Sequence, residues 1–303
     1  MRALVVARGD TGPVRFDEVG EPLPTPHEAL VEIRHIGLNL GELKHADQWP
    51  VGAIHGHDAS GVVLRAAADG TGPAEGARVA LGHAPHAWAE RIAVAPAWLG
   101  VVPDGVDLGD AAAVGVAGVT ALRALRSRSV LARRVLVTGA SGGVGRFAVQ
   151  LAGVAGAHVS ALVGSPERAA GLRELGADEV ATDISGLLGE FDLVVDTVGG
   201  PQLAAVWDRL AVGGDVQLVG FASGLPTTFP TGSLFSFGTP RTLSTFGDTV
   251  SAVDAELADL LELLASGRLS AEVGLRAGWH DVDHAVRSLF AREVRGKIVL
   301  DVT

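Results

Sequence analysis

The chain has 303 residues, a net charge of −11 at neutral pH, no Cys and no Tyr. This length allows two domains with separate cores, and the missing Cys excludes disulfides, thiolate zinc sites and cysteine nucleophiles. The acidic balance argues against nucleic acid or an anionic membrane surface as a partner.

The first hundred residues show a β pattern, in which short apolar runs alternate with turn signals such as the Pro-rich segment 22–26. Many short strands without long helices indicate a small barrel. The expected strands are 3–6, 29–36, 59–66, 78–80, 87–94 and 99–102. The Ala-rich segment 107–125 then predicts helix and leads through a basic linker into the next region.

From residue 135 to about residue 218, expected strands and helices alternate, which predicts a parallel sheet with helices on both faces. After the opening strand and helix we expect strands at 158–163, 179–182, 191–196 and 215–220, and helices at 166–175 and 201–210. Beyond a loop at 221–237 the pattern predicts a strand at 241–246, helices at 254–264 and 280–291, and a strand at 297–302.

A glycine cluster joins the opening strand to its helix, in the segment Val-Leu-Val-Thr-Gly-Ala-Ser-Gly-Gly-Val-Gly at 135–145. Such a turn needs residues without Cβ because the backbone turns sharply, approaches a phosphate and packs helix against strand. The amides and positive dipole of the new helix favour a pyrophosphate. The cluster therefore predicts a dinucleotide site, with contributions from Gly139, Ser141, Gly142, Gly143, Val144 and Gly145.

The end of the second strand of this region indicates which dinucleotide is bound. An NAD-specific site would place an acid there, but the chain reads Gly164-Ser165-Pro-Glu-Arg168. A hydroxyl and a guanidinium suit the 2′-phosphate of NADPH, so we favour NADPH over NADH. Alternatively, Ser165 caps the next helix, with Pro166 in its first position, and Arg168 is solvated surface. Both descriptions can hold together.

Two further loops follow strands of the same sheet and are expected to line the same crevice. Their alternative interpretation is ordinary glycine turns. The expected cofactor-binding residues are Thr197, Val198 and Gly199 in the first loop, and Val219, Gly220 and Phe221 in the second.

Eight short motifs occur in order along nearly the whole chain, at 36–39, 56–61, 89–94, 102–105, 119–121, 139–145, 175–178 and 296–300. With these motifs the sequence resembles the medium-chain dehydrogenase/reductase superfamily, specifically its zinc-free quinone oxidoreductase-like branch. The resemblance implies an α/β fold with a GroES-like β-barrel domain at 1–113, a Rossmann doubly wound parallel sheet domain at 114–246, and a return segment at 247–303 that completes the first domain.

The resemblance also implies a small-molecule substrate, a homodimer, and a position beside the nicotinamide for Thr120. That hydroxyl could instead bond back to its own helical turn. No apolar run reaches the length of a membrane span, and the amino terminus is too short in its apolar part for a signal peptide. Because the absence of Cys fits a reducing compartment, we expect a cytoplasmic protein.

The sequence departs from zinc-dependent relatives at the position of a Cys ligand, where it has Asn39, although His57 survives in a Gly-His-Asp signature. Zinc usually needs three protein ligands, so we expect no metal and a hydrogen-bonded structural role for His57. The remaining candidate histidines have no spacing that favours a metal, and they are His45, His55, His83 and His86.

The absence of Tyr removes the proton donor of some enoyl-thioester-reducing relatives. Proton delivery then falls to Lys44, to His57, to water or to no protein group, since a reduced quinone can take its proton from solvent. Asn39 could donate a hydrogen bond to a carbonyl oxygen that gains negative charge, or it could pin the loop after its strand. We interpret Glu42 as loop structure.

We therefore expect an NADPH-dependent reductase that passes a hydride to a quinone, an enone or a related activated carbonyl or alkene without zinc. Four phenylalanines in the segment 221–246 would form part of the acceptor pocket, or alternatively core or subunit contacts: Phe221, Phe229, Phe235 and Phe237. One alternative function is an enoyl-thioester or polyketide-tailoring reductase, for which the acidic balance offers no basic entry. Another is a non-catalytic NADPH-binding protein like the crystallin-type relatives.

Overall fold

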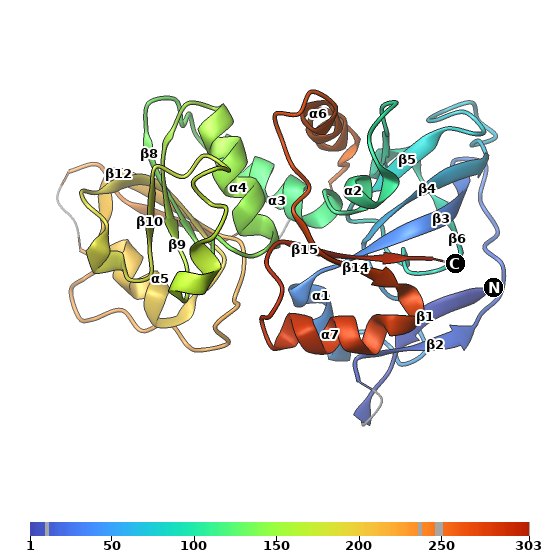
Figure 1. Ribbon diagram of the computed structural model, residues 1–303, viewed down its shortest axis with the longest axis horizontal. Helices are drawn as coiled ribbons and strands as arrows, with labels where there is room; N and C mark the ends of the chain where they lie inside the picture. The colour runs from blue at the N-terminus through green and yellow to red at the C-terminus, as the bar shows by residue number, and fades with distance from the viewer. Residues whose placement is uncertain (10–11, 236–237, 246–250, 303) are drawn as a thin grey trace. The chain divides into compact units, whose positions relative to one another are not determined.

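The structure, a computed structural model, describes residues 1–9, 12–235, 238–245 and 251–302. The chain divides into two compact units, of which the first contains residues 1–119 and 249–303 and the second contains residues 120–248 (Figure 1). The domain boundaries expected after residues 113 and 246 stay a proposal. Within the described residues, no helix combines the length and the apolar character needed to cross a bilayer.

A seven-stranded sheet forms the body of the first unit, in the order β14-β15-β3-β4-β5-β7, with β6 also pairing with β3. The longest strand, β3, changes register at two places along its pairing with β4. The carboxyl-terminal β15 pairs antiparallel with β3, so the end of the chain completes this sheet. The strands are β3 (Ala29–Leu38), β4 (Asp58–Arg65), β5 (Arg78–Leu81), β6 (Arg91–Val94), β7 (Leu99–Val101), β14 (Val273–Gly278) and β15 (Lys297–Asp301).

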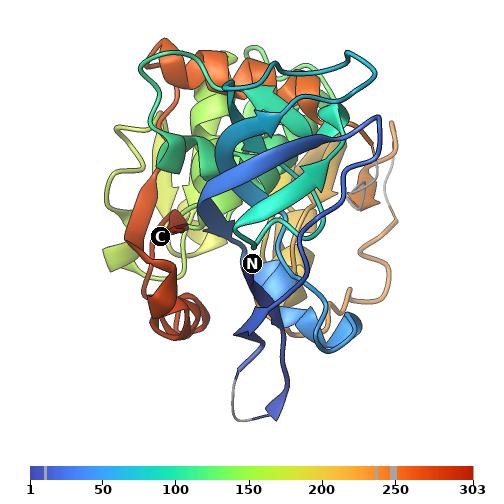
Figure 2. The ribbon, with the colours of Figure 1, turned by 90° about the vertical axis from the view of Figure 1, so that its right-hand side faces the viewer.

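A separate two-stranded ribbon joins β1 (Arg2–Val6) and β2 (Val14–Glu18), coloured dark blue in Figure 2. We did not expect β2 or β14, because their few apolar residues are separated by charged residues and glycine. The strand expected at 87–94 is shorter than predicted, since residues 87–90 contribute only an isolated bridge between Ala3 and Ala89.

Helices of the first unit pack on its core, which contains the buried rings of Trp88 and Trp279. The helix expected at 107–125 is two helices. The residues between them, 113 and 114, lie outside both. The helices that begin in the first unit are α1 (Leu40–Lys44), α2 (Leu108–Ala112), α3 (Gly115–Arg126), α6 (Asp254–Ala265) and α7 (Val282–Phe290), the last preceded by a 3₁₀ turn at Trp279–Asp281.

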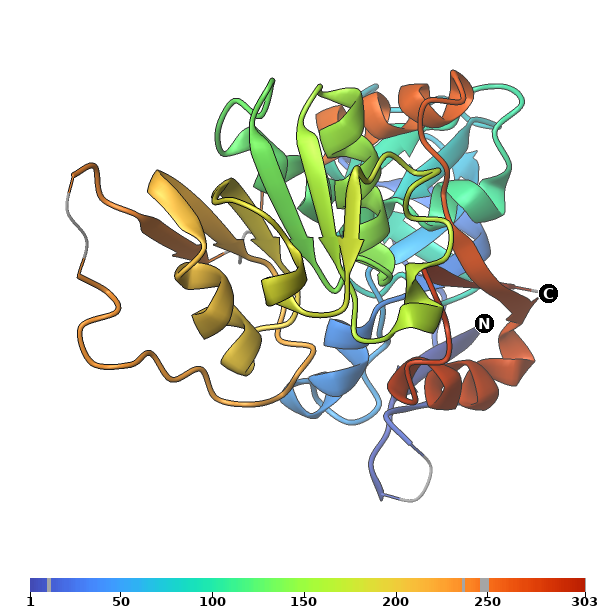
Figure 3. The same ribbon diagram turned by 60° about the vertical axis from the view of Figure 1, so that its left-hand side comes forward.

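The second unit contains a six-stranded sheet in the order β10-β9-β8-β11-β12-β13, whose strand pairs are all parallel (Figure 3). Strand order reverses between β8 and β11, the point at which open α/β sheets bind ligands. This confirms the expected fold class. The elements are β8 (Arg134–Thr138), α4 (Gly143–Val154), β9 (His158–Leu162), β10 (Glu179–Ala181), β11 (Phe191–Asp196), α5 (Gly200–Trp207), β12 (Leu210–Leu218) and β13 (Thr242–Thr245).

The prediction of a helix at 166–175 was wrong. The structure has a single 3₁₀ turn at Pro166–Ala169 followed by irregular turns. Gly171 has a φ of +81°, a left-handed conformation that ends a helix and that glycine adopts without strain. Leu172 beyond it is nevertheless buried, so the segment still covers the core. The strand expected at 241–246 corresponds to β13, and Phe246 lies outside the described residues.

Candidate functional site

The glycine turn between β8 and α4 excludes side chains at two positions. Gly139 has a φ of +56°, and a Cβ on it would collide with the Thr197 hydroxyl. A Cβ on Gly145 would collide with the carbonyl oxygen of Gly139 and with Ala140. The backbone therefore closes on itself as tightly as the sequence predicts, and only glycine fits both places.

At the amino terminus of α4, the amides of Gly143 and Val144 have no hydrogen-bond acceptor among the residues that the structure describes. Its N-cap is Gly142, which has no side chain to cap the helix and whose own amide donates to the Gly139 carbonyl at 2.9 Å. Gly143 and Val144, in the first turn, are half-buried. Such an end offers unpaired N–H groups and a positive dipole to an anion, so the turn fits a pyrophosphate.

Arg168 reaches back from the 3₁₀ turn after β9 to this glycine turn. Its Nε donates to the Oγ of buried Ser141 at 2.7 Å. The guanidinium is therefore held beside the glycine turn, which the solvated-surface alternative did not anticipate. A guanidinium has the fork geometry that suits a phosphate.

Ser165 and Gly164 lie at the start of the same loop. Ser165 is the N-cap of the 3₁₀ turn but makes no capping hydrogen bond with its side chain. Its hydrogen bond to Glu167 instead lowers the pKa of that exposed carboxyl. Gly164 is exposed and has open space where a Cβ would be.

Hydrogen bonds join the loops that follow β8 and β11. The buried Asp196 carboxylate accepts from the Thr138 hydroxyl and from the backbone amides of Val198, at 3.2 Å, and Gly199, at 3.0 Å. The Thr197 hydroxyl donates to the Thr138 carbonyl at 2.9 Å. Burial raises the pKa of Asp196, while these hydrogen bonds oppose the rise.

The loop after β12 joins the same group. The Val219 amide donates to the Asp196 carbonyl at 2.8 Å, and the Ala222 amide donates to the Thr197 carbonyl at 3.1 Å. A Cβ on Gly220 would collide with that same Thr197 carbonyl. The three predicted loops thus lie side by side at the carboxyl ends of β8, β11 and β12. We did not predict the Thr138 and Asp196 pair that joins them, although a polar residue at the end of each buried strand was a visible signal.

The apolar residues expected in the acceptor pocket separate in the structure. Phe229 packs against Trp207 with ring centroids 5.9 Å apart and contacts the core of the second unit, which favours the core interpretation. Phe221 and Phe235 are exposed, and Phe237 lies outside the described residues. Thr120 is buried within α3.

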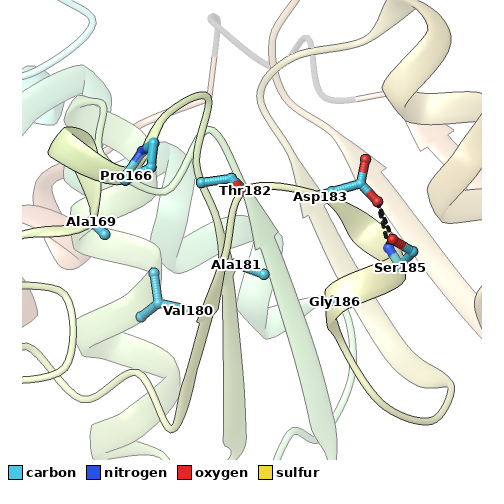
Figure 4. Close-up of a pocket in the computed structure, with 8 residues that line it drawn as sticks. All are labelled: Pro166, Ala169, Val180, Ala181, Thr182, Asp183, Ser185 and Gly186. Atoms are coloured by element: carbon cyan, nitrogen blue, oxygen red, sulfur yellow. Dashed lines mark hydrogen bonds between the residues drawn. The ribbon is translucent and has the colours of Figure 1, made fainter.

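A hollow of about 470 Å³ lies beside the Arg168 loop, between the 3₁₀ turn at Pro166–Ala169 and residues 180–186 (Figure 4). Asp183 stands at this hollow, and its carboxylate accepts from the Ser185 hydroxyl at 2.5 Å and from the Ser185 amide at 2.8 Å. These hydrogen bonds lower the pKa of Asp183, so the carboxyl carries a negative charge there. A phosphate is therefore better placed at the glycine turn than in this hollow.

A buried polar cluster occupies the first unit where β3, β4 and β15 meet. The Asn39 amide donates through Nδ2 to Glu42 Oε1 at 3.0 Å and to Asp58 Oδ2 at 2.8 Å. Its Oδ1 accepts from Lys297 Nζ at 2.6 Å. Because both amide hydrogens are already engaged, the structure favours the loop-pinning role of Asn39 over donation to a substrate oxygen.

Lys297 forms an ion pair with Asp58 at 3.0 Å, with side chains only 2% and 0% exposed. Asp58 Oδ1 also accepts from the Val116 amide at 2.6 Å. Burial raises the pKa of Asp58, whereas the Lys297 ammonium and the Asn39 amide oppose this rise. We missed both residues, although a Lys at the head of an apolar strand was a signal for a buried partner.

Glu42 has a larger role than the loop structure that we expected. One of its oxygens accepts from the Asn39 backbone amide at 2.8 Å, the arrangement of a capping box at the start of α1. The other accepts from His57 Nδ1 at 2.8 Å. Lys44 is exposed in the last turn of α1.

His57 is hydrogen-bonded as expected, and its partner is a carboxylate. Its side chain is 21% exposed, whereas that of Glu42 is 5% exposed. Burial alone would lower the pKa of His57, but the hydrogen bond to Glu42 and the charges of Glu42 and Asp58 outweigh it and raise the pKa. In contrast, burial lowers the pKa of His55, whose Nε2 donates to the Glu42 carbonyl at 3.0 Å.

In the part of the chain that the structure describes, no group of three His, Cys, Asp or Glu side chains is placed so that it could hold a metal ion. His57 Nδ1 is hydrogen-bonded to a carboxylate, and His83 and His86 lie in left-handed turns with φ values of 55° and 68°.

Comparison with known proteins adds two family matches. Residues 25–122 match the alcohol dehydrogenase GroES-like domain, and residues 143–266 match the zinc-binding dehydrogenase domain. A quinone oxidoreductase of Pseudomonas aeruginosa is 31% identical over 300 residues, covering 91% of this chain and 92% of that protein.

Two solved structures resemble the fold along its length. The quinone oxidoreductase of Pseudomonas syringae pv. Tomato DC3000 aligns with a TM-score of 0.87 and 27% identity, over 99% of both chains. A mycobacterial protein complexed with NADPH aligns with a TM-score of 0.86 and 27% identity, over 100% of both chains.

Proposed function

The chain is an NADPH-dependent oxidoreductase of the quinone oxidoreductase-like branch of the medium-chain dehydrogenase/reductase superfamily, and we propose that it transfers a hydride to a quinone, an enone or a related activated carbonyl or alkene without zinc. The observation that carries the cofactor assignment is the contact of Arg168 with Ser141 at the glycine turn.

Within the second unit each residue type has a physical role toward the cofactor. The Gly139 to Gly145 turn and the amino terminus of α4 would hold the pyrophosphate through backbone amides. Arg168, with Ser165 beside it, would hold the 2′-phosphate. NADPH when bound supplies the hydride. The protein residues bind it, orient it and exclude water.

The residue chemistry of the first unit supports a zinc-free reaction. Asn39 stands where zinc-dependent relatives have a thiolate, and its amide is engaged by Lys297, Asp58 and Glu42. A divalent cation at this place would lie near the Lys297 ammonium, which repels it and already pairs with the Asp58 carboxylate, and the chain has no thiolate to offer as a ligand. We propose that electrophilic activation by a metal is replaced by proton delivery from the protein or from water.

The decisive test is consumption of NADPH with a panel of acceptors: a benzoquinone, a naphthoquinone, an alkyl enone and an enoyl thioester. NADH replaces NADPH in one control, and zinc or a chelator is added in another. We expect quinones or enones to be reduced with NADPH, and neither zinc nor the chelator to change the rate. Turnover restricted to the thioester would replace this proposal with the tailoring reductase. Tight NADPH binding without any turnover would replace it with the non-catalytic binder.

We also infer that the protein is a cytoplasmic homodimer, as the family resemblance implies. The edge strand β13 supports self-association, since its Leu243 is 40% exposed and an edge strand can pair with a second chain. Light scattering coupled to size-exclusion chromatography measures the mass directly, and a monomer at micromolar concentration would contradict the dimer.

A further inference from the structure

The Glu42 and His57 pair has the arrangement of an acid held in place by a carboxylate. His57 Nδ1 donates to Glu42 Oε2 at 2.8 Å, which leaves Nε2 as the reactive nitrogen. Among the described residues no hydrogen-bond partner contacts Nε2, and this atom is not fully buried. Solvent or a substrate therefore has access to Nε2.

We propose that His57 is the proton donor for the acceptor that receives the hydride, and that Glu42 is the positioning residue that orients the imidazole through its hydrogen bond to Nδ1. This inference rests on the proposed function, because it needs a substrate that takes up a hydride. It assigns to a histidine the task for which this chain has no Tyr.

The carboxylate of Glu42 is itself held on both oxygens. Oε1 accepts from the backbone amide of Asn39 at 2.8 Å and from its side chain at 3.0 Å, and Oε2 accepts from His57. Asn39 is in turn fixed by Lys297 at 2.6 Å. The imidazole is thus oriented by a chain of groups that begins at a buried ammonium, which limits its rotation.

The groups that face His57 make the charged imidazole favourable. The carboxyl groups of Glu42 on α1 and Asp58 on β4 both act to raise the pKa of His57 against the effect of burial. The ring of Trp49 lies 5.7 Å from it, and the ring of His55 lies 6.2 Å from it. Burial lowers the pKa of His55, which favours its uncharged form. Lys297 is the nearby cation, and it is paired with Asp58.

The Nε2–H bond of the imidazolium breaks, its electron pair stays on nitrogen, and an O–H or C–H bond forms on the acceptor as the hydride arrives from NADPH. Nδ1–H remains bonded to Glu42. The neutral imidazole then takes a proton from water, so one proton is consumed for each NADPH oxidised.

The kinetic test compares the wild type with His57→Gln and Glu42→Gln, using the acceptor with the highest turnover over a range of pH. In the wild type we expect kcat to fall as pH rises through the pKa of His57. His57→Gln should lower kcat by on the order of 100-fold and remove this pH dependence, with little change in KM for NADPH. Glu42→Gln keeps a side chain suited to the capping box. It should move the midpoint of the pH dependence of kcat down by about one pH unit.

The matched control is His45→Gln, which removes an exposed histidine at the end of the same helix. Its kcat and pH profile should equal those of the wild type. If His57→Gln retains the wild-type kcat, water is the proton source and the donor role is overturned. If Glu42→Gln lowers kcat at all pH values without moving the midpoint, its role is structural and the positioning role is overturned.

A second readout does not depend on turnover. Proton NMR titration of the imidazole in the full-length protein without cofactor gives the His57 midpoint, with the resonance assigned by its loss in His57→Gln. We expect a midpoint above 6.5 in the wild type and a lower one in Glu42→Gln. An unmoved midpoint would overturn the pairing even if the enzyme is active. A shifted midpoint in a protein that reduces no acceptor would instead locate the failure in the proposed function, and the donor role would fall with it.

Discussion

Arg168 Nε donates to Ser141 Oγ at 2.7 Å, and this contact links the loop after β9 to the glycine turn after β8, where we propose that the cofactor phosphates bind. The two residues are 27 positions apart and lie in the segments that follow the neighbouring strands β8 and β9 of the parallel sheet. A cation is therefore already in place beside the turn before any ligand arrives. Pre-organisation of this kind lowers the entropic cost of binding a phosphate.

Arg168→Ala should weaken NADPH binding about tenfold or more and leave NADH nearly unchanged, because a hydrogen bond to a charged group contributes about 1.5–3 kcal/mol. Only NADPH carries the 2′-phosphate. Fluorescence titration with both cofactors measures the difference. Arg173→Ala is the matched control, since Arg173 is exposed and bonds to the Asp178 carbonyl in the same region. Equal loss of both cofactors in Arg168→Ala would exclude the phosphate role.

Gly145→Ala should abolish cofactor binding and destabilise the second unit, because the new methyl group would collide with backbone atoms of Gly139 and Ala140. Gly153→Ala in the same helix provides the contrast. Its Cβ would meet Gly176 only at ordinary distances of 3.5 Å or more, so a gain of about 0.5–1 kcal/mol in helix stability is expected. Thermal unfolding and NADPH titration distinguish the two variants. Wild-type affinity in Gly145→Ala would mean that the turn is looser than described.

Lys297→Met should destabilise the first unit by about 3–5 kcal/mol, because it leaves the Asp58 carboxylate buried without its cation. The double variant Lys297→Met with Asp58→Asn removes both charges and should recover much of that loss. Urea unfolding of the single and double variants gives the coupling energy between the two residues. Additive losses would show that the pair is not coupled.

Several features of the second unit could be predicted from sequence, because their strand, turn and helix signals are local. They are the glycine turn, the alternation of strands and helices, and the loops after β11 and β12. The segment after Pro166 could not, since Gly171 interrupts a helical pattern of apolar residues through its backbone conformation. Local periodicity does not report where a single left-handed residue ends a helix.

The cluster around Asn39 was only partly predictable. Asn39 and His57 attracted notice through their motifs, but Lys297 lies 258 positions from Asn39 and meets it only because β15 pairs with β3. The spacing of the two residues in the sequence does not predict this contact. The structural role expected for Glu42 agrees with its capping box, but its hydrogen bond to His57 could not be predicted, because that histidine lies 15 residues further along the chain in another segment.

His57 also makes the stability of the first unit depend on pH in a defined direction. Its pKa in the folded state lies above the ordinary value of 6.5, so folding favours the protonated form. The stabilisation is fully present below pH 6.5 and is lost as pH rises through the folded pKa of His57.

The lowered pKa of His55 acts in the opposite sense, since its contribution to stability is lost as pH falls below 6.5. Subtracting the profile of Glu42→Gln from that of the wild type gives the pH dependence that the Glu42 charge causes through His57, together with its weaker effect in raising the pKa of His55. Urea unfolding at pH values below and above the folded pKa should show that the stability advantage of the wild type over Glu42→Gln shrinks as pH rises. An advantage that is constant with pH would mean that Glu42 stabilises α1 alone and that its charge does not act on His57.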